Sequence, residues 1–259
     1  MRKPLIAGNW KMNTSLSESK ELASAIAKTF SQTHECDVLL LPPYVNLESV
    51  RHHVLNTPIL LGAQNLHFED KGAFTGEISG QMLRNIGCGY VLVGHSERRQ
   101  FFGDTDEWVN KKIRASLRNL LFPIVCVGET LSQRERKQTF SVISNQLHTA
   151  FSDINEKEIP QCVIAYEPVW AIGTGNTASP AEAQEVHVSI RQWFSRHYND
   201  AFASRVRILY GGSVTAHTIA DLMAEPDLDG ALVGGSSLKV NEFIEIVKKT
   251  IHIKSSKGV

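Results

Sequence analysis

The chain has 259 residues, of which 42% are hydrophobic and 21% are charged, values typical of a globular protein rather than a disordered one. Its 27 Lys and Arg residues balance its 27 Asp and Glu residues, and a formal net charge of 0 argues against nucleic acid as the main partner. The apolar stretch near the amino terminus is too short for a secretion signal, and no apolar run approaches the roughly 20 residues that span a bilayer. We therefore expect neither a nucleic-acid nor a membrane partner.

The cysteines give no sign of a disulfide framework or a metal site. They are Cys36, Cys88, Cys126 and Cys162, which are widely spaced and have no histidine at a metal-ligand spacing. Three of them lie in apolar runs, where a thiol usually behaves as a small core hydrophobe. This pattern predicts free buried thiols, no zinc and a reducing, cytoplasmic location.

Short apolar runs rich in Val, Ile and Leu recur along the chain, and each ends in a polar or glycine-bearing turn. The runs are nearly continuous rather than alternating, which is typical of parallel strands buried on both faces. Eight such runs predict strands, at 4–10, 37–43, 58–65, 90–97, 122–129, 162–168, 206–213 and 230–237.

Helical patterns lie between these strands. The segment 15–30 opens with Ser15 as a cap, and 240–251 places four apolar residues on one helix face. Eight strands alternating with helices in about 250 residues predict an α/β fold, a closed, eight-stranded (β/α)8 barrel forming a single domain over 1–259. An open, doubly wound sheet is the alternative. Residues 254–259 are expected to form a flexible tail.

Two glycine-rich motifs suggest nucleotide binding but do not fit it. Residues 89–96 have the spacing of a phosphate-binding loop, but their centre is strand-like Val-Leu-Val. Residues 173–178 match the relaxed dinucleotide fingerprint, but Pro168 and Trp170 separate them from the preceding strand. We interpret Gly173 and Gly175 as parts of a loop whose backbone approaches a ligand.

Polar residues follow the predicted strands at their carboxyl ends, where the active sites of barrels lie. They are Asn9 and Lys11 after the first strand, His95 and Glu97 after the fourth, Glu167 after the sixth, and the Gly-Gly-Ser turns 211–213 and 234–236 after the last two. Each residue alone is more often a rim charge or a structural group, but their alignment at one mouth predicts a site. A carboxylate base, a cation, an imidazole and a phosphate cradle suit proton abstraction next to the carbonyl of a small phosphorylated metabolite. We expect no metal and no organic cofactor.

These residues lie in seven motifs that resemble the triosephosphate isomerase family over nearly the whole chain. The motifs are AGNWKMN (7–13), GAFTGEIS (72–79), VGHSERR (93–99), VCVGET (125–130), AYEPVWAIGTG (165–175), ILYGGSV (208–214) and LVGGSSL (232–238). The resemblance implies a TIM barrel that interconverts dihydroxyacetone phosphate and glyceraldehyde 3-phosphate in glycolysis and gluconeogenesis. It also implies a cytosolic homodimer.

The resemblance implies a role for each of the strand-end residues. Glu167 matches the base, His95 the neutral electrophile, and Lys11 the cation that offsets the charge of the enediolate and the phosphate. Asn9 matches a neighbouring donor, and Glu97 a supporting acidic group. If 96–99 begin a helix, its positive end would favour an uncharged His95.

The remaining assignments concern loops. Gly173, Ser213, Gly234 and Gly235 match the phosphate cradle, 168–178 match a lid that excludes water, and 72–77, with Thr75 at its tip, match a loop that enters the partner subunit. Two positions depart from the family pattern. Asn176 replaces a lysine at the lid hinge, and Ser236 replaces an alanine at a position that we expect to lie outside the phosphate donors.

Two other functional classes remain open at this level. A phosphate-binding aldolase would use Lys11 as a Schiff base, which requires a desolvated lysine, and borohydride would then trap the substrate on it. A catalytically inactive barrel could serve as an adhesin or scaffold, although the intact set of Asn9, Lys11, His95 and Glu167 argues against that function.

Overall fold

Eight parallel strands form a closed barrel in the computed structural model, which describes residues 2–158, 161–171 and 178–256. The strands pair in chain order, and β1 closes the ring by pairing with β8, Ile6 opposite Ala231. The prediction of a (β/α)8 barrel is confirmed, and the open sheet is excluded. The strands are β1 (Leu5–Asn9), β2 (Asp37–Leu41), β3 (Leu60–Ala63), β4 (Tyr90–Val93), β5 (Phe122–Val127), β6 (Val163–Tyr166), β7 (Arg207–Tyr210) and β8 (Gly230–Val233).

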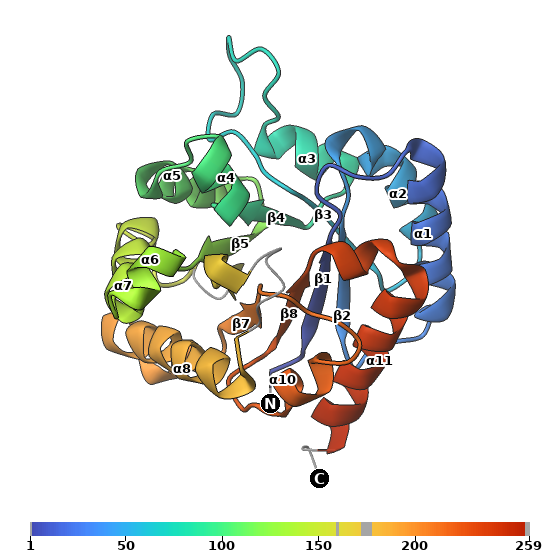
Figure 1. Cartoon of the computed structure of the whole chain (residues 1–259). Helices are drawn as coiled ribbons and strands as arrows, with labels where there is room; N and C mark the ends of the chain where they lie inside the picture. The colour runs from blue at the N-terminus through green and yellow to red at the C-terminus, as the bar shows by residue number, and fades with distance from the viewer. Residues whose placement is uncertain (1, 159–160, 172–177, 257–259) are drawn as a thin grey trace.

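The helices form an outer ring around the strands (Figure 1). They are α1 (Leu16–Thr29), α2 (Leu47–Val54), α3 (Gly80–Ile86), α4 (Ser96–Phe101), α5 (Asp106–Arg118), α6 (Leu131–Glu135), α7 (Thr139–Ala150), α8 (Pro180–His197), α9 (Asp200–Ala203), α10 (Ile219–Ala224) and α11 (Val240–Ser256). Short 3-10 turns follow three of the strands at η1 (Tyr44–Asn46), η3 (Val169–Ala171) and η4 (Gly235–Leu238).

The helix starts follow local capping chemistry. The predicted cap at Ser15 is confirmed, because its side chain accepts a hydrogen bond from the backbone N–H of Glu18. The Glu18 carboxylate in turn accepts from the backbone N–H of Ser15, which completes a capping box. Ser179 and Glu182 repeat the arrangement at α8. These capping boxes fix the first residues of α1 and α8.

Alternate strand residues build two separate cores. One fills the inside of the barrel, and the other lies between the strands and the surrounding helices. Leu5 and Ala7 of β1 belong to the inner core, as do Val163 and Ala165 of β6, whereas Ile6 and Ile164 face the helices. The period of two places every second residue inside, so Asn9 and Glu167 continue the inward positions of their strands into the barrel mouth.

His95 does not follow this alternation. Tyr90 and Leu92 of β4 point inward, so residue 95 falls on the outward parity. Gly94, which lies between the end of β4 and His95, has φ +71°, a left-handed conformation that redirects the chain at the end of the strand. A Cβ at Gly94 would lie 2.6 Å from Val109 Cγ2, so the position also requires the close packing that glycine allows.

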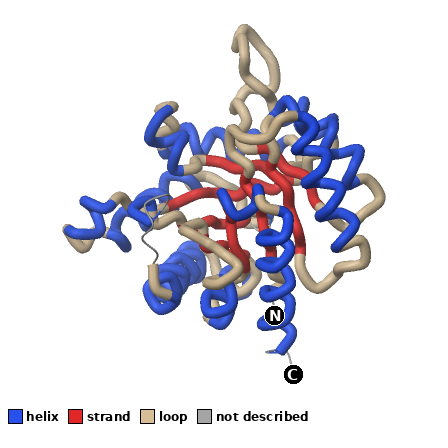
Figure 2. The backbone as a smooth tube through the Cα atoms, turned by 45° about the vertical axis from the view of Figure 1, so that its right-hand side comes forward, coloured by secondary structure: helices blue, strands red, loops and turns tan. Residues whose placement is uncertain are grey.

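The carboxyl terminus differs from the predicted tail. Helix α11 continues through Ser256 rather than ending at residue 251, and residues 257–259 lie outside the described part of the chain. Ile253 packs against the outer core, and the Lys254 Nζ donates to the backbone carbonyl of Glu225 at 3.2 Å. These contacts extend the helix beyond the stretch that we predicted. Figure 2 shows both termini on the same side of the molecule.

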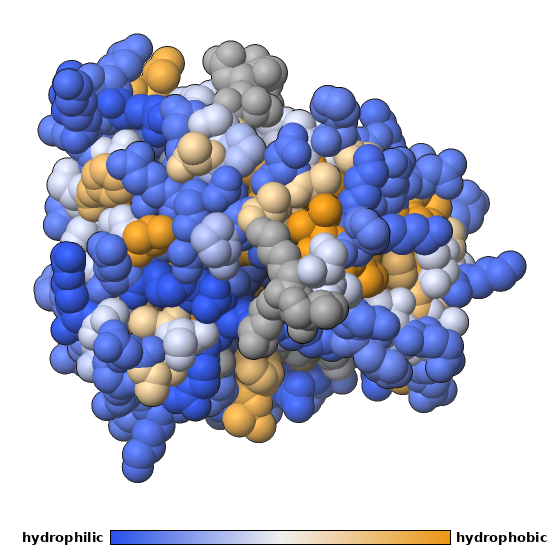
Figure 3. All heavy atoms as spheres, turned by 90° about the horizontal axis from the view of Figure 1, so that it is seen from below, coloured by the Kyte–Doolittle hydropathy of each residue, from blue (hydrophilic) through white to orange (hydrophobic). Residues whose placement is uncertain are grey.

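The outer surface is largely polar. The face drawn in Figure 3 is predominantly hydrophilic, with apolar residues in small separate patches. Among the described helices, none is long and apolar enough to cross a membrane.

Candidate active site

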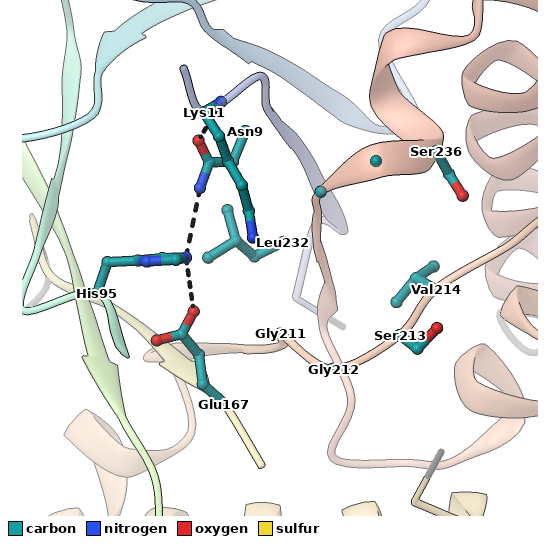
Figure 4. Close-up of a pocket in the computed structure, with 12 residues that line it drawn as sticks. Asn9, Lys11, His95, Glu167, Gly211, Gly212, Ser213, Val214, Leu232 and Ser236 are labelled. Carbon is teal, nitrogen blue, oxygen red and sulfur yellow. Dashed lines mark hydrogen bonds and ion pairs between the residues drawn. The ribbon is translucent and has the colours of Figure 1, made fainter. Parts of the chain in front are cut away.

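A pocket of about 240 Å³ opens at the carboxyl-terminal mouth of the barrel (Figure 4). It brings together Asn9, Lys11, His95 and Glu167, four of the residues predicted from strand ends. Glu97 lines an adjacent cavity instead and reaches the pocket through Lys11, whereas Gly173 lies outside the described residues. The pocket is lined by Asn9, Lys11, His95, Glu167, Gly211, Gly212, Ser213, Val214, Leu232, Gly234, Gly235 and Ser236.

Glu167 is a buried carboxylate that keeps its charge. Its Oε1 lies 3.0 Å from His95 Nε2, and its Oε2 accepts a hydrogen bond from the backbone N–H of Ser96 at 2.8 Å. Burial raises the pKa of Glu167, but the contacts with His95 and Ser96 outweigh burial and lower the pKa below its ordinary value. The carboxylate is therefore ionised at neutral pH and available as a base.

Two glycines leave the space that Glu167 occupies. A Cβ at Gly128 would lie 1.8 Å from the Glu167 carbonyl oxygen, a distance that no side chain could adopt. A Cβ at Gly211 would lie 2.9 Å from Glu167 Cγ. The glycines at the ends of β5 and β7 thus allow β6 to bring its carboxylate into the mouth.

His95 is the cap residue of α4, and its Nδ1 accepts a hydrogen bond from the backbone N–H of Glu97 at 3.3 Å. Burial lowers the pKa of His95, but the Glu167 carboxylate raises it, and the net direction is above the ordinary value. Because Nδ1 is an acceptor, the proton of the neutral ring belongs on Nε2, facing Glu167. The backbone N–H at Nδ1 favours the uncharged ring that we expected, whereas the Glu167 carboxylate at Nε2 favours the charged one.

Lys11 adopts a strained backbone conformation, with φ +53°. A non-glycine residue in this region costs about 1–3 kcal/mol and persists only where surrounding contacts hold it. The Asn9 Oδ1 accepts from the Lys11 backbone N–H at 3.0 Å, and the Gln64 amide donates to the Lys11 carbonyl at 2.9 Å. The Nζ forms an ion pair with Glu97 at 2.5 Å. Glu97 therefore positions the cation and is not itself at the pocket wall.

Ser213 and the second Gly-Gly-Ser turn, 234–236, lie across the pocket from the His95–Glu167 pair, whereas Gly211 adjoins Glu167 (Figure 4). A Cβ at Gly234 would lie 3.9 Å from Lys11 Nζ, which places the cation between the two sides. At Gly235 a Cβ would meet nothing within 4 Å, so no packing contact requires glycine there. Such an open backbone next to a cation suits an anion approaching from the pocket.

A second buried carboxylate, Glu129, supports the start of the predicted lid. Its Oε1 accepts from Trp170 Nε1 at 2.9 Å and from the Tyr166 hydroxyl at 3.2 Å, and Arg134 lies 3.4 Å away. Glu129 was not predicted from the sequence, although it lies two residues after the fifth strand, as His95 lies two residues after the fourth. Residues 172–177 of the predicted lid, including Asn176, lie outside the described residues.

Two pocket-lining residues, Val214 and Leu232, were not predicted from the sequence. Leu232 had a usable signal, because it occupies an inward position of the last strand. Val214 lies in a loop that carries no periodicity. Ser236 was predicted as part of the turn 234–236 and was expected to lie outside the phosphate donors, and the structure places it on the pocket wall.

Comparison with known proteins agrees with the geometry. The family model for triosephosphate isomerase matches residues 4–250. The triosephosphate isomerase of Endomicrobium trichonymphae is 52% identical over 248 residues, covering 96% of this chain and 99% of the relative. The relatives from Herpetosiphon aurantiacus and Thermoanaerobacter pseudethanolicus, with the same name, are 50% and 51% identical over 96% and 95% of this chain, and 99% of each relative is covered. The chain therefore belongs to the triosephosphate isomerase family.

Proposed function

We propose that this chain interconverts dihydroxyacetone phosphate and glyceraldehyde 3-phosphate through an enediolate. The observation that carries the proposal is the buried, ionised Glu167 at 3.0 Å from His95 in a pocket that also holds Lys11. Glu167 removes a proton from the carbon next to the substrate carbonyl and returns it to the neighbouring carbon. The same carboxylate therefore serves both directions of the reaction.

The other residues act on the oxygen atoms. His95 Nε2 donates a hydrogen bond to the carbonyl oxygen, which gains negative charge as the carbon proton leaves. Lys11 supplies a positive charge close to the enediolate and to the phosphate, and Asn9 holds the Lys11 backbone through its side-chain oxygen. Ser213, Gly234, Gly235 and Gly173 form the phosphate cradle in this proposal. Residues 168–178 close over the intermediate and exclude water.

A coupled assay with each triose phosphate tests this function. We expect the purified chain to convert both substrates, and the Glu167→Gln variant to lose that activity while it keeps the shape of the site. An equal rate for this variant would show that Glu167 is not the base, and no rate for the wild-type chain would refute the proposal.

The site disfavours the aldolase alternative. A Schiff-base lysine reacts as a neutral amine in a desolvated pocket. Lys11 Nζ instead forms an ion pair with Glu97, and the Lys11 side chain is 29% exposed. No contact of the described residues favours the scaffold alternative over catalysis.

We expect His95 to be uncharged at pH 7 when an inert phosphorylated analogue occupies the site. The analogue would draw the Glu167 carboxylate towards the substrate carbon, which removes the contact that raises the pKa of His95. The backbone N–H at Nδ1 then opposes protonation. Nitrogen-15 NMR measures the charge state directly. Buried His187, whose pKa is lowered to about 3, gives a neutral reference in the same spectrum. An imidazolium signal from His95 would contradict the assignment.

The proposal includes a homodimer that forms through the loop 72–77, which projects from the body of the molecule (Figure 1). A cavity of about 180 Å³ adjoins the candidate active site and shares Asn9, Lys11 and His95 with it. Its rim includes Met12 and Phe102, which are 97% and 64% exposed. An exposed apolar rim next to a projecting loop suits a two-fold contact in which each loop fills the partner's cavity.

Deletion of residues 73–76 is expected to give a monomer whose turnover is reduced about 100-fold or more, because a misplacement of about 1 Å near the chemistry costs that much. Sedimentation and the coupled assay measure the two effects. The Leu55→Ser variant removes another exposed apolar side chain, 54% exposed and outside both the loop and the cavity, and should change neither. A fully active monomer would separate catalysis from assembly.

We also propose a cytoplasmic location. All four cysteines are buried free thiols, as predicted, and such thiols are maintained in a reducing compartment.

A further inference from the structure

Two neighbouring serines at the end of β8 have different environments. Ser237 is fully buried, and its hydroxyl donates to the Gly234 carbonyl at 2.7 Å, so it holds the turn together. Ser236 is partly exposed and lines the active-site pocket. Among the described residues, no side-chain hydrogen bond engages the Ser236 hydroxyl, which leaves it available to a ligand in the pocket.

The Ser236 hydroxyl lies in the same pocket as the residues predicted to bind the phosphate. Figure 4 shows Ser213 and Ser236 on the side of the pocket away from His95 and Glu167, with Val214 drawn between them. Gly234 and Gly235 lie on the same wall, and Lys11 Nζ is within 4 Å of a Cβ built at Gly234. A dianion bound at this wall would thus lie near the two serine hydroxyls, with the Lys11 cation at its edge.

We propose that the Ser236 hydroxyl is a side-chain donor to the substrate phosphate, opposite Ser213. This inference rests on the proposed function, and it adds a binding residue to it. Hydrogen bonds to charged groups are stronger than those between neutral groups, so one more donor should tighten the binding of any phosphate monoester. The phosphate stays unchanged during the reaction, so the added bond stabilises bound substrate and transition state equally and acts on KM rather than on kcat.

The test compares Ser236→Ala with Ser236→Thr in two measurements. Calorimetric titration with inorganic phosphate reports binding without catalysis, and steady-state kinetics with glyceraldehyde 3-phosphate report KM and kcat. We expect Ser236→Ala to raise the phosphate Kd and the KM about five- to tenfold with kcat nearly unchanged, as loss of one charged hydrogen bond at a partly exposed site predicts. Ser236→Thr, which keeps the hydroxyl, should stay close to the wild-type values.

A matched control is Ser204→Ala, which removes a serine hydroxyl before β7, at the opposite end of the barrel, and should change neither value. An unchanged Kd in Ser236→Ala would overturn the inference even if the wild-type chain is an active isomerase. An equal weakening by Ser236→Thr would also overturn it, because it would show that side-chain shape matters rather than the hydroxyl. A wild-type chain that binds phosphate through Ser236 but does not isomerise triose phosphates would refute the proposed function and leave the inference standing.

Discussion

Glu167→Asp should reduce kcat on the order of 100-fold with little change in KM. The substitution withdraws the carboxylate by about 1 Å from the carbon that it must deprotonate, and misplacement of this size costs about that factor. The backbone of residue 167 cannot shift to restore the lost distance, because it packs closely against Gly128. A Cβ at Gly128 would lie 1.8 Å from the Glu167 carbonyl oxygen. Steady-state kinetics in both directions measure the effect.

A matched control is Glu185→Asp, the same substitution at an exposed position of α8, which should leave kcat unchanged.

The acid limb of the pH profile of the wild-type chain gives a second measurement of the role of Glu167. The profile of kcat/KM reports the free enzyme, in which contacts with His95 and Ser96 lower the pKa of Glu167, so the base stays ionised below neutral pH and kcat/KM falls only as the pH drops through that lowered value. Unchanged turnover of Glu167→Asp would remove Glu167 from the role of base.

Lys11→Met should reduce kcat/KM by about 100- to 1,000-fold, the loss expected when one donor to a developing oxyanion is removed, and Lys11→Arg should lose much less. Methionine preserves length and removes the charge, whereas arginine preserves the charge and changes its geometry. Methionine would also leave the Glu97 carboxylate without its partner at 2.5 Å, which adds negative charge beside an anionic substrate. The comparison of the two variants isolates the contribution of the charge.

Lys3→Met is the matched control. Lys3 forms an ion pair with Asp37 at 2.6 Å before β1, at the end of the barrel opposite the mouth, so its loss removes a cation and leaves a carboxylate away from the site. Such surface pairs contribute about 0–1 kcal/mol to stability, and we expect full activity. Equal residual activities of the methionine and arginine variants at residue 11 would show that Lys11 does not act through its charge.

Several features of the site could be predicted from the sequence because they depend on neighbours along the chain. Eight apolar runs predicted eight strands, and Ser15 predicted the start of α1 through contacts only three residues apart. The polar residues at the ends of these runs, Asn9 and Glu167 among them, were predicted to meet at one mouth. The period of two explains why both point inward, Asn9 after Leu5 and Ala7 and Glu167 after Val163 and Ala165. The strand-end positions therefore identified most of the pocket before any tertiary contact was known.

Other features were decided only when the barrel closed. His95 lies on the outward parity of β4, and the left-handed conformation of Gly94 accompanies its turn into the mouth. Lys11 and Glu97 are 86 residues apart, and their ion pair exists because the first and fourth strands open onto the same mouth. The environments of Ser236 and Ser237 likewise differ although the residues are adjacent and identical. Local periodicity sets the direction of a side chain within an element, whereas the partner that it meets depends on residues brought close by the tertiary structure.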